Sequence, residues 1–251
     1  MKNVSVFIKT FEKDYEWLPW CLESIRKNLR GWHKTYLLYD YGSPPPPAVP
    51  DFVNLVACEG WPDSYGINRG PTTTSYGYQM QKVHKLEWER GSFEGDAVLQ
   101  IDSDSMVTEP ADIRDLYFAP DGRPIWWVSA WANASRNEMA NWSRGRELFA
   151  PGSPLNHMRR VGFLLTREAT NNCALYLQKR FGSVANAFLG SKVSLSVYNT
   201  FGLYLERYAK DRDGYAFQLD CYPQHWPIKT FHSWTGLTPE KRVEMDSYLG
   251  Y

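Results

Sequence analysis

Residues 97–105 read AVLQIDSDS, and this stretch decides the fold that we expect. Its first five residues are apolar apart from Gln100, a pattern typical of a strand buried on both faces. Similar apolar runs occur earlier, in VSVFI at 4–8 and TYLLY at 35–39, and a helical apolar pattern over 18–29 separates those two. Strands that alternate with helices in this way predict βαβ units and a parallel sheet.

The remaining sequence adds further elements to this core. We expect strands at 53–57, 124–130, 161–166, 217–221 and 228–231, and helices at 76–90, 168–181 and 193–209. The stretches 59–75 and 131–157 show no periodicity and predict irregular structure. The expected fold class is therefore α/β, with a mixed, mostly parallel sheet flanked by helices in a single domain.

The composition narrows the function classes. The 251 residues carry 28 basic and 28 acidic side chains, so a protein whose affinity rests on an overall field that attracts polyanions is disfavoured. No pair of the four cysteines has C-x-x-C spacing, which disfavours zinc and redox sites. Because there is no 18-residue apolar run, we expect a cytoplasmic protein without a membrane partner.

Two carboxylates stand where the strand at 97–101 ends. Asp102 and Asp104 are two residues apart, which places them on one face, and ligands of parallel sheets bind at the carboxyl ends of strands. A hard divalent cation, Mg²⁺ or Mn²⁺, together with a diphosphate is the natural partner of such a pair. The alternative is an ordinary Asx turn. A second pair, Asp211 and Asp213, follows a helix and predicts only a turn.

Together these features resemble the GT-A glycosyltransferases, which transfer a sugar from a nucleotide diphosphate. The resemblance rests on the opening strand at 4–11, on Asp40 after the second strand, and on LQIDSD at 99–104 as the DxD motif. The opening FIKTFEKDYEWLPWCLESI at 7–25 is similar to a branch found in phages and bacteria. The resemblance implies a GT-A-like fold over 1–251, with a donor-binding half at 1–110 and an acceptor-binding half with a closing segment at 111–251.

The resemblance also implies roles for individual residues, with a UDP-sugar as the expected donor. Asp102 would lie near the ribose and the metal, Asp104 would ligate the metal, and His232 would complete the metal shell or touch the diphosphate. The implied catalytic residues are Asp102, Asp104 and Lys82, with Lys82 neutralising charge on the leaving diphosphate. The implied substrate contacts are Thr10 and Phe11 at the base and ribose, Asp40 at the base or ribose, Gln79 at the sugar, and Trp234 beside His232.

Each of these residues has a simpler explanation. Thr10 could cap the following helix, and Asp40 could be a turn residue. Gln79 and Lys82 could form a solvated helix face, which is the reading we favour for Lys85. His232 could be a buried structural histidine, with His225 as the rival ligand.

The acceptor side is expected in residues 126–160, where aromatic and arginine side chains alternate. These are Trp126, Trp127, Trp131, Arg136, Trp142, Arg144, Arg146, His157, Arg159 and Arg160, of which Trp131, Arg159 and Arg160 are the chosen substrate contacts. Such side chains suit stacking on a sugar chain or on a nucleic-acid strand. Because the opening at 7–25 resembles a phage-type branch, the resemblance implies a 5-hydroxymethylpyrimidine in phage-type DNA as the acceptor, with a glycan or a small molecule as alternatives. The simpler explanation is a solvated surface with the tryptophans in the core.

The sequence does not single out a catalytic base. The resemblance implies an acidic residue beside the helix that includes SLSVYN at 194–199, but this stretch has no carboxylate. Either the base is elsewhere, with Glu138, Glu147 and Asp220 as candidates, or the enzyme retains configuration and needs none.

Two other classes compete with the glycosyltransferase. An aspartate-nucleophile phosphatase also has D-x-D after a strand, but Met106 stands where that motif has Thr or Val. A non-catalytic nucleotide- or carbohydrate-binding module would explain the aromatic content but not the carboxylate pair.

Overall fold

The protein is a mixed α/β structure built around one five-stranded sheet. The computed structural model describes residues 3–40, 43–58, 76–91, 93–158, 161–189, 195–209, 214–220 and 225–251. The strand order is β10-β5-β1-β3-β4, formed by β1 (Val4–Lys9), β3 (Thr35–Asp40), β4 (Val53–Cys58), β5 (Ala97–Asp102) and β10 (Phe163–Thr166). All neighbours pair in parallel except β10, which runs antiparallel to β5. The expectation of a mostly parallel α/β sheet is thus confirmed.

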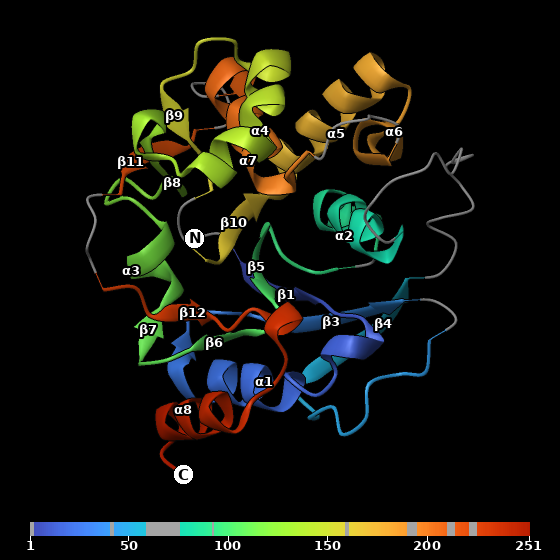
Figure 1. The fold of residues 1–251 in the computed structure, drawn as a ribbon, viewed down its shortest axis with the longest axis vertical. Coiled ribbons are helices and arrows are strands. Elements are labelled where there is room, and N and C mark those ends of the chain that lie inside the picture. The colour runs from blue at the N-terminus through green and yellow to red at the C-terminus, as the bar shows by residue number, and fades with distance from the viewer. Residues whose placement is uncertain are drawn as a thin grey trace.

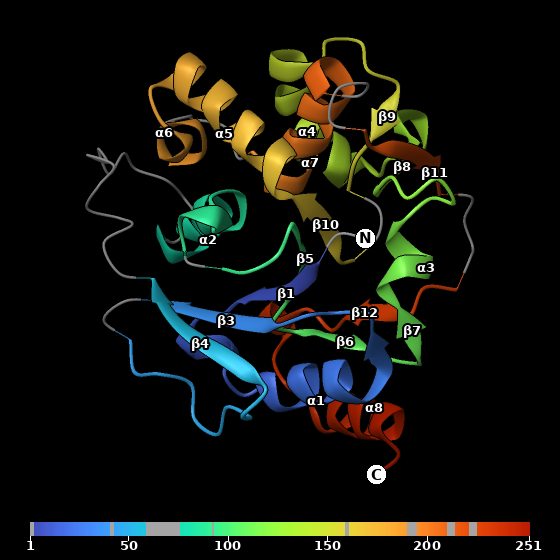
Figure 2. The ribbon, with the colours of Figure 1, turned by 180° about the vertical axis from the view of Figure 1, so that it is seen from behind.

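Helices cover both faces of this sheet (Figure 1). They are α1 (Leu18–Asn28), α2 (Tyr76–Leu86), α3 (Ile113–Tyr117), α4 (Arg136–Phe149), α5 (Arg167–Phe181), α6 (Val184–Leu189), α7 (Val197–Tyr204) and α8 (Pro239–Leu249). Strand residues alternate between the faces: Val6 and Ile8 pack with α1, whereas Phe7 packs with α2. The view from behind shows the same layers, with α8 beyond α1 and α4–α7 above α2 (Figure 2). Within the described part of the chain, no helix is both long and apolar enough to cross a bilayer.

Short strands form three smaller sheets at the edges of the main one. β6 (Ser105–Val107) pairs with β12 (Ile228–Thr230), β2 (Leu29–Arg30) with β7 (Ala111–Asp112), and β8 (Ile125–Ala130) with β9 (Leu155–Asn156) and β11 (Ala216–Leu219). Single turns complete the description: η1 (Glu12–Asp14), η3 (Trp88–Arg90), η4 (Trp131–Asn133), the π-helical turn η5 (Leu205–Ala209) and η6 (Ser233–Thr235).

The C-terminal segment folds back onto the start of α1. Phe231 packs with Trp17 and Met106, and Met245 and Leu249 of α8 complete this small apolar cluster. The cluster therefore fixes the segment that follows β12 next to the residues that follow β5.

The structure corrects the sequence analysis in the second half of the chain. The expectation of irregular structure over 131–157 is wrong, because α4 occupies the middle of that stretch. α6 and α8 were not expected, and α2 is shorter than predicted because it ends at Leu86. The stretch 59–75 lies outside the described residues.

Candidate active site

Parallel pairing brings three strand ends to one edge of the main sheet. Lys9, the last residue of β1, lies opposite Asp102 of β5 on one side and opposite Leu38 of β3 on the other. Asp40 ends β3 two residues further on. The carboxyl ends of β1, β3 and β5 thus meet at the edge where ligands of such sheets bind.

Asp102 ends β5 and Asp104 lies in the turn that follows; together they form the DxD turn. Asp104 is 9 % exposed, and its Oδ2 accepts a hydrogen bond of 2.7 Å from the backbone N–H of Ser233. Burial, and then the charge of Asp102, raise the pKa of Asp104 above its ordinary value. The side chain of Asp102 is 36 % exposed, so the pair has one enclosed and one accessible member.

A third carboxylate, Asp14, lies against this turn. Asp14 follows β1 in η1, is 5 % exposed, and accepts a hydrogen bond of 2.9 Å from Ser103 Oγ. Burial raises the pKa of Asp14 to about 6; the Ser103 and Ser233 hydroxyls oppose this, and the charges of Asp104 and Asp102 add to it. The sequence analysis missed Asp14. The available signal was its position just after β1, which neighbours β5 in the sheet.

The segment that follows β12 lies directly against the DxD turn. Thr230 pairs with Ser105, and the N–H of Phe231 donates to the carbonyl oxygen of Asp104 at 2.9 Å. His232 comes next, exposed and with a φ of +58°, a backbone conformation that residues other than glycine rarely adopt. The two hydrogen bonds from its neighbours to Asp104 hold His232 in this conformation beside the carboxylates.

The rival histidine is placed elsewhere. His225 pairs with Glu109 at 2.8 Å near the far end of β6, and its side chain is 73 % exposed. Of the two, His232 is the one that the structure brings to Asp104.

Buried lysines lie behind the carboxylates. Lys9 is 1 % exposed, and its Nζ contacts Asp40 Oδ1 at 2.5 Å. Lys85 is 6 % exposed and forms an ion pair with Asp102 Oδ1. The favoured reading of Lys85 as a solvated residue is therefore wrong, because α2 lies between the sheet and the helices α6 and α7. Burial lowers the pKa of Lys85, but the interactions with Asp102 and Tyr198 outweigh burial and raise this pKa above its usual range.

Lys82, chosen from the sequence as a catalytic residue, is also buried. It is 6 % exposed, and burial together with the nearby charge of Lys85 lowers the pKa of Lys82 to about 8. His84, on the same helix, has its pKa lowered to about 3 by burial and by Lys9. An anionic ligand beside Lys82 would favour its charged form.

The donor set suits a hard divalent cation that also binds a substrate. Among the residues that the structure describes, no three His, Cys, Asp or Glu side chains are placed to hold a metal by themselves. Mg²⁺ is commonly bound by one or two carboxylates plus phosphate oxygens, and Asp102 and Asp104 offer that number. The raised pKa of Asp104 shows the repulsion and desolvation that a cation would relieve.

Some predicted contacts are not brought to this edge. Thr10 is fully buried and its N–H donates to the carbonyl of Leu38, so it does not offer its side chain to a ligand. It does not cap a helix either, since Phe11, which is half-buried, stands at the N-terminal position of η1. Trp131 follows β8 in another sheet, where its ring stacks under the Arg146 guanidinium at 4.0 Å.

The expected acceptor cluster is partly core. Trp126 is 2 % exposed and its indole N–H donates to Nδ1 of the buried His157, so these two side chains are structural. Among the candidate bases, Glu147 is exposed on α4 and Asp220 follows β11. Several predicted positions lie outside the described residues or side chains: Arg159, Arg160, Asp211, Asp213 and the side chains of Gln79, Glu138, Trp142, Arg144 and Trp234.

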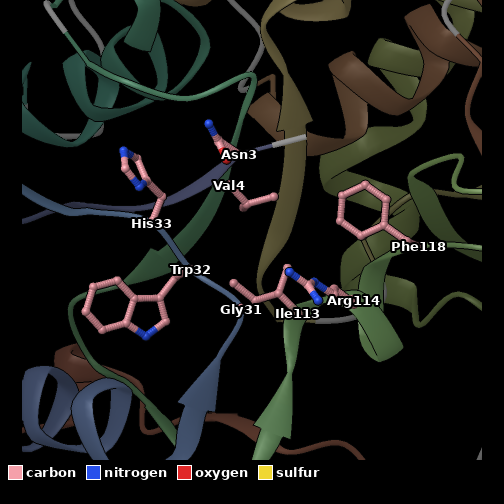
Figure 3. Close-up of a pocket in the computed structure, with 8 residues that line it drawn as sticks. All are labelled: Asn3, Val4, Gly31, Trp32, His33, Ile113, Arg114 and Phe118. Carbon is pink, nitrogen blue, oxygen red and sulfur yellow. The ribbon is translucent and has the colours of Figure 1, made fainter. Parts of the chain in front are cut away.

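A cavity of about 210 Å³ lies at the opposite edge of the sheet (Figure 3). Its wall includes Val4, the first residue of β1, together with Trp32, His33 and Arg114. Val4 is five residues before Lys9, which corresponds to about 17 Å along a strand. This cavity is therefore separate from the carboxylate edge.

We compared the chain with protein-family models and with curated proteins, and neither comparison finds a match.

Proposed function

We propose that this protein is a metal-dependent glycosyltransferase of the GT-A type, which moves a sugar from a nucleotide diphosphate, with UDP as the expected nucleotide, to a hydroxyl group. One observation carries the proposal. Asp102 and Asp104 stand at the carboxyl end of a central strand of a mostly parallel sheet, with Asp14 and the segment around His232 packed against them.

The residues of this edge divide into two groups with different tasks. Asp102 and Asp104 would hold Mn²⁺ or Mg²⁺, and His232, whose neighbour Ser233 donates to Asp104, would complete the metal shell or touch the diphosphate. The bound cation would act as a Lewis acid on the leaving diphosphate. Lys82 would supply a positive charge to the same diphosphate, and the diphosphate would favour the charged form of this lysine, whose pKa burial and Lys85 lower.

The exposed part of the edge would bind the nucleoside. Asp40 ends β3 with its side chain 30 % exposed, and Lys9 holds one of its oxygens. Its second oxygen is then available to accept hydrogen bonds from a base or a ribose. Phe11, half-buried two residues after β1, would offer its ring to the base.

The described residues say less about the acceptor than about the donor. Trp131 with its stacked Arg146 remains an aromatic and cationic pair of the kind that binds sugars or bases. We retain 5-hydroxymethylpyrimidine DNA as the acceptor and test it against glycans. A DNA acceptor requires binding that weakens as salt increases, because arginines displace counterions from phosphates.

The test is release of the nucleotide from a panel of nucleotide-sugars with Mn²⁺, using hydroxymethylated DNA or oligosaccharides as acceptors. We expect Asp104→Asn to lower transfer by about 100-fold or more, because it removes a charge that holds the metal. The matched control is Asp51→Asn, at an exposed position just ahead of the amino end of β4, and it should retain activity.

Three results would contradict parts of the proposal. Full activity of Asp104→Asn refutes the metal role of this carboxylate. Nucleotide binding without release from any donor favours a binding module. DNA affinity that is absent at low salt, or unchanged by salt, excludes the DNA acceptor.

A further inference from the structure

We propose that Lys85 is a positioning residue that holds Asp102 and cancels its charge, so that the carboxylate pair binds the divalent cation weakly until the diphosphate arrives. The inference rests on the proposed function and assigns a task within the same site to Lys85, which the proposed function does not use.

Lys85 is attached to β5 at two points. Its ammonium group pairs with Oδ1 of Asp102, and its carbonyl oxygen accepts a hydrogen bond from the side-chain amide of Gln100. Gln100 and Asp102 are two residues apart on β5, so they lie on the same face of the sheet. The last turn of α2 is therefore fixed against the end of β5, and Lys85 sets the orientation of the Asp102 side chain.

An aromatic ring closes the other side of the ammonium group. Tyr198, in the first turn of α7, has its ring centroid 5.3 Å from Lys85 Nζ and is 5 % exposed. Tyr198 is itself fixed, because its ring stacks on Phe163 of β10 with centroids 3.6 Å apart and planes within 10°. The ammonium group of Lys85 therefore lies between a carboxylate and an aromatic ring and has little room to move. A solvated surface lysine would not be confined in this way.

The pairing divides the work of the two aspartates. Lys85 engages one oxygen of Asp102, while the side chain remains 36 % exposed and keeps an oxygen for the ligand. Asp104 has no lysine partner among the described residues, and its Oδ2 is held by a backbone N–H. The net charge of the pair with Lys85 is therefore one negative unit rather than two. A divalent cation is attracted less strongly by one unit than by two, and the diphosphate supplies the missing negative charge.

Removing the charge of Lys85 tests this directly. In Lys85→Met the pair regains its second negative charge, so the free protein should bind Mn²⁺ about tenfold more tightly. Sugar transfer should fall at the same time, mainly in kcat, because Asp102 is no longer oriented. A purely structural lysine would not tighten metal binding when removed. Lys85→Gln is the second variant: it keeps a donor for Asp102, and with it the local fold, but carries no charge, and it should show the same tightening.

The matched control is Lys34→Met. Lys34 forms an ion pair with Glu94, lies ahead of β3 near the amino edge of the sheet, and its loss changes the net charge of the protein by the same unit. We would measure Mn²⁺ affinity by titration calorimetry without nucleotide, then with UDP, and follow transfer by nucleotide release. Lys34→Met should leave the Mn²⁺ affinity within twofold of the wild type.

The outcomes separate the two proposals. If the wild type binds Mn²⁺ and transfers sugar while folded Lys85→Met and Lys85→Gln bind Mn²⁺ no more tightly than Lys34→Met, the role of Lys85 is refuted and the function stands. If the wild type binds Mn²⁺ with the expected Lys85 effect but transfers no sugar, the glycosyltransferase assignment fails and the charge balance stands. A wild type that binds no Mn²⁺ even in the presence of UDP overturns both.

Discussion

Asp14 offers a test of the site that needs no substrate. Its carboxyl has a pKa of about 6 in the folded protein, against 3.8 ordinarily, mainly because it is buried. A raised pKa means that the folded state resists the charged form, so the charge destabilises the protein above pH 6. This penalty fades as the pH falls towards the unfolded value. With 1.36 kcal/mol for each unit of difference, the penalty is about 3 kcal/mol at pH 8 and about 1.6 kcal/mol at pH 5.

The perturbation is Asp14→Asn, which removes the charge and keeps an oxygen that can accept from Ser103. We subtract about 1 kcal/mol for the weaker hydrogen bonds of a neutral acceptor. The variant should therefore be about 2 kcal/mol more stable than the wild type at pH 8 and about 0.5 kcal/mol more stable at pH 5. Urea unfolding followed by tryptophan fluorescence, in EDTA so that no cation contributes, measures both values.

The control for that experiment is Asp51→Asn, which removes an exposed charge and should change stability by less than about 0.5 kcal/mol at either pH. The reasoning is refuted if Asp14→Asn is no more stable than the wild type at pH 8. It is refuted equally if the difference between the two proteins does not shrink between pH 8 and pH 5.

Two further substitutions test the packing of the core and the ion pair between β1 and β3. Gly202→Ala would place a Cβ 2.5 Å from the buried ring of His157, so it should destabilise the protein by about 2 kcal/mol in thermal or urea unfolding despite the better helix propensity of alanine. Gly145→Ala is its control, since a Cβ there meets only ordinary contacts, and it should be neutral or slightly stabilising. Asp40→Asn leaves Lys9 buried without its carboxylate and should cost about 3 kcal/mol in urea unfolding; a loss below about 0.5 kcal/mol would show that this pair does not hold β1 to β3.

The central strands could be predicted because they obey a simple rule. β1, β3 and β5 are buried on both faces, so their sequences are nearly continuous apolar runs, and the DxD pair follows the last of them. Helix α4 was not predicted because its sequence is mostly polar and its apolar residues show no clear period. In contrast, α8 carried readable signals, since Thr238 caps it, Pro239 begins it and Gly250 ends it.

The residues of the site could be predicted from the sequence only in part, for a different reason. A polar residue on a helix normally indicates a solvated face, and this rule predicted that Lys85 is exposed to solvent. It fails for α2 because that helix is covered by the sheet on one side and by α6 and α7 on the other. Asp14 was missed because its nearness to Asp104 depends on the sheet order, in which β1 neighbours β5. Neither fact is contained in local periodicity.

The ionisable groups of this edge agree with the ligand that we propose. The pKa of Asp14 and of Asp104 is raised and that of Lys82 is lowered, so the fold holds carboxylates and an ammonium group that are each driven towards neutrality. A lone cation would relieve the carboxylates but would be unfavourable near Lys82, and a lone phosphate would do the reverse. A divalent cation joined to a diphosphate would satisfy both groups at once, which is why we propose that the carboxylates and Lys82 form one site and not two.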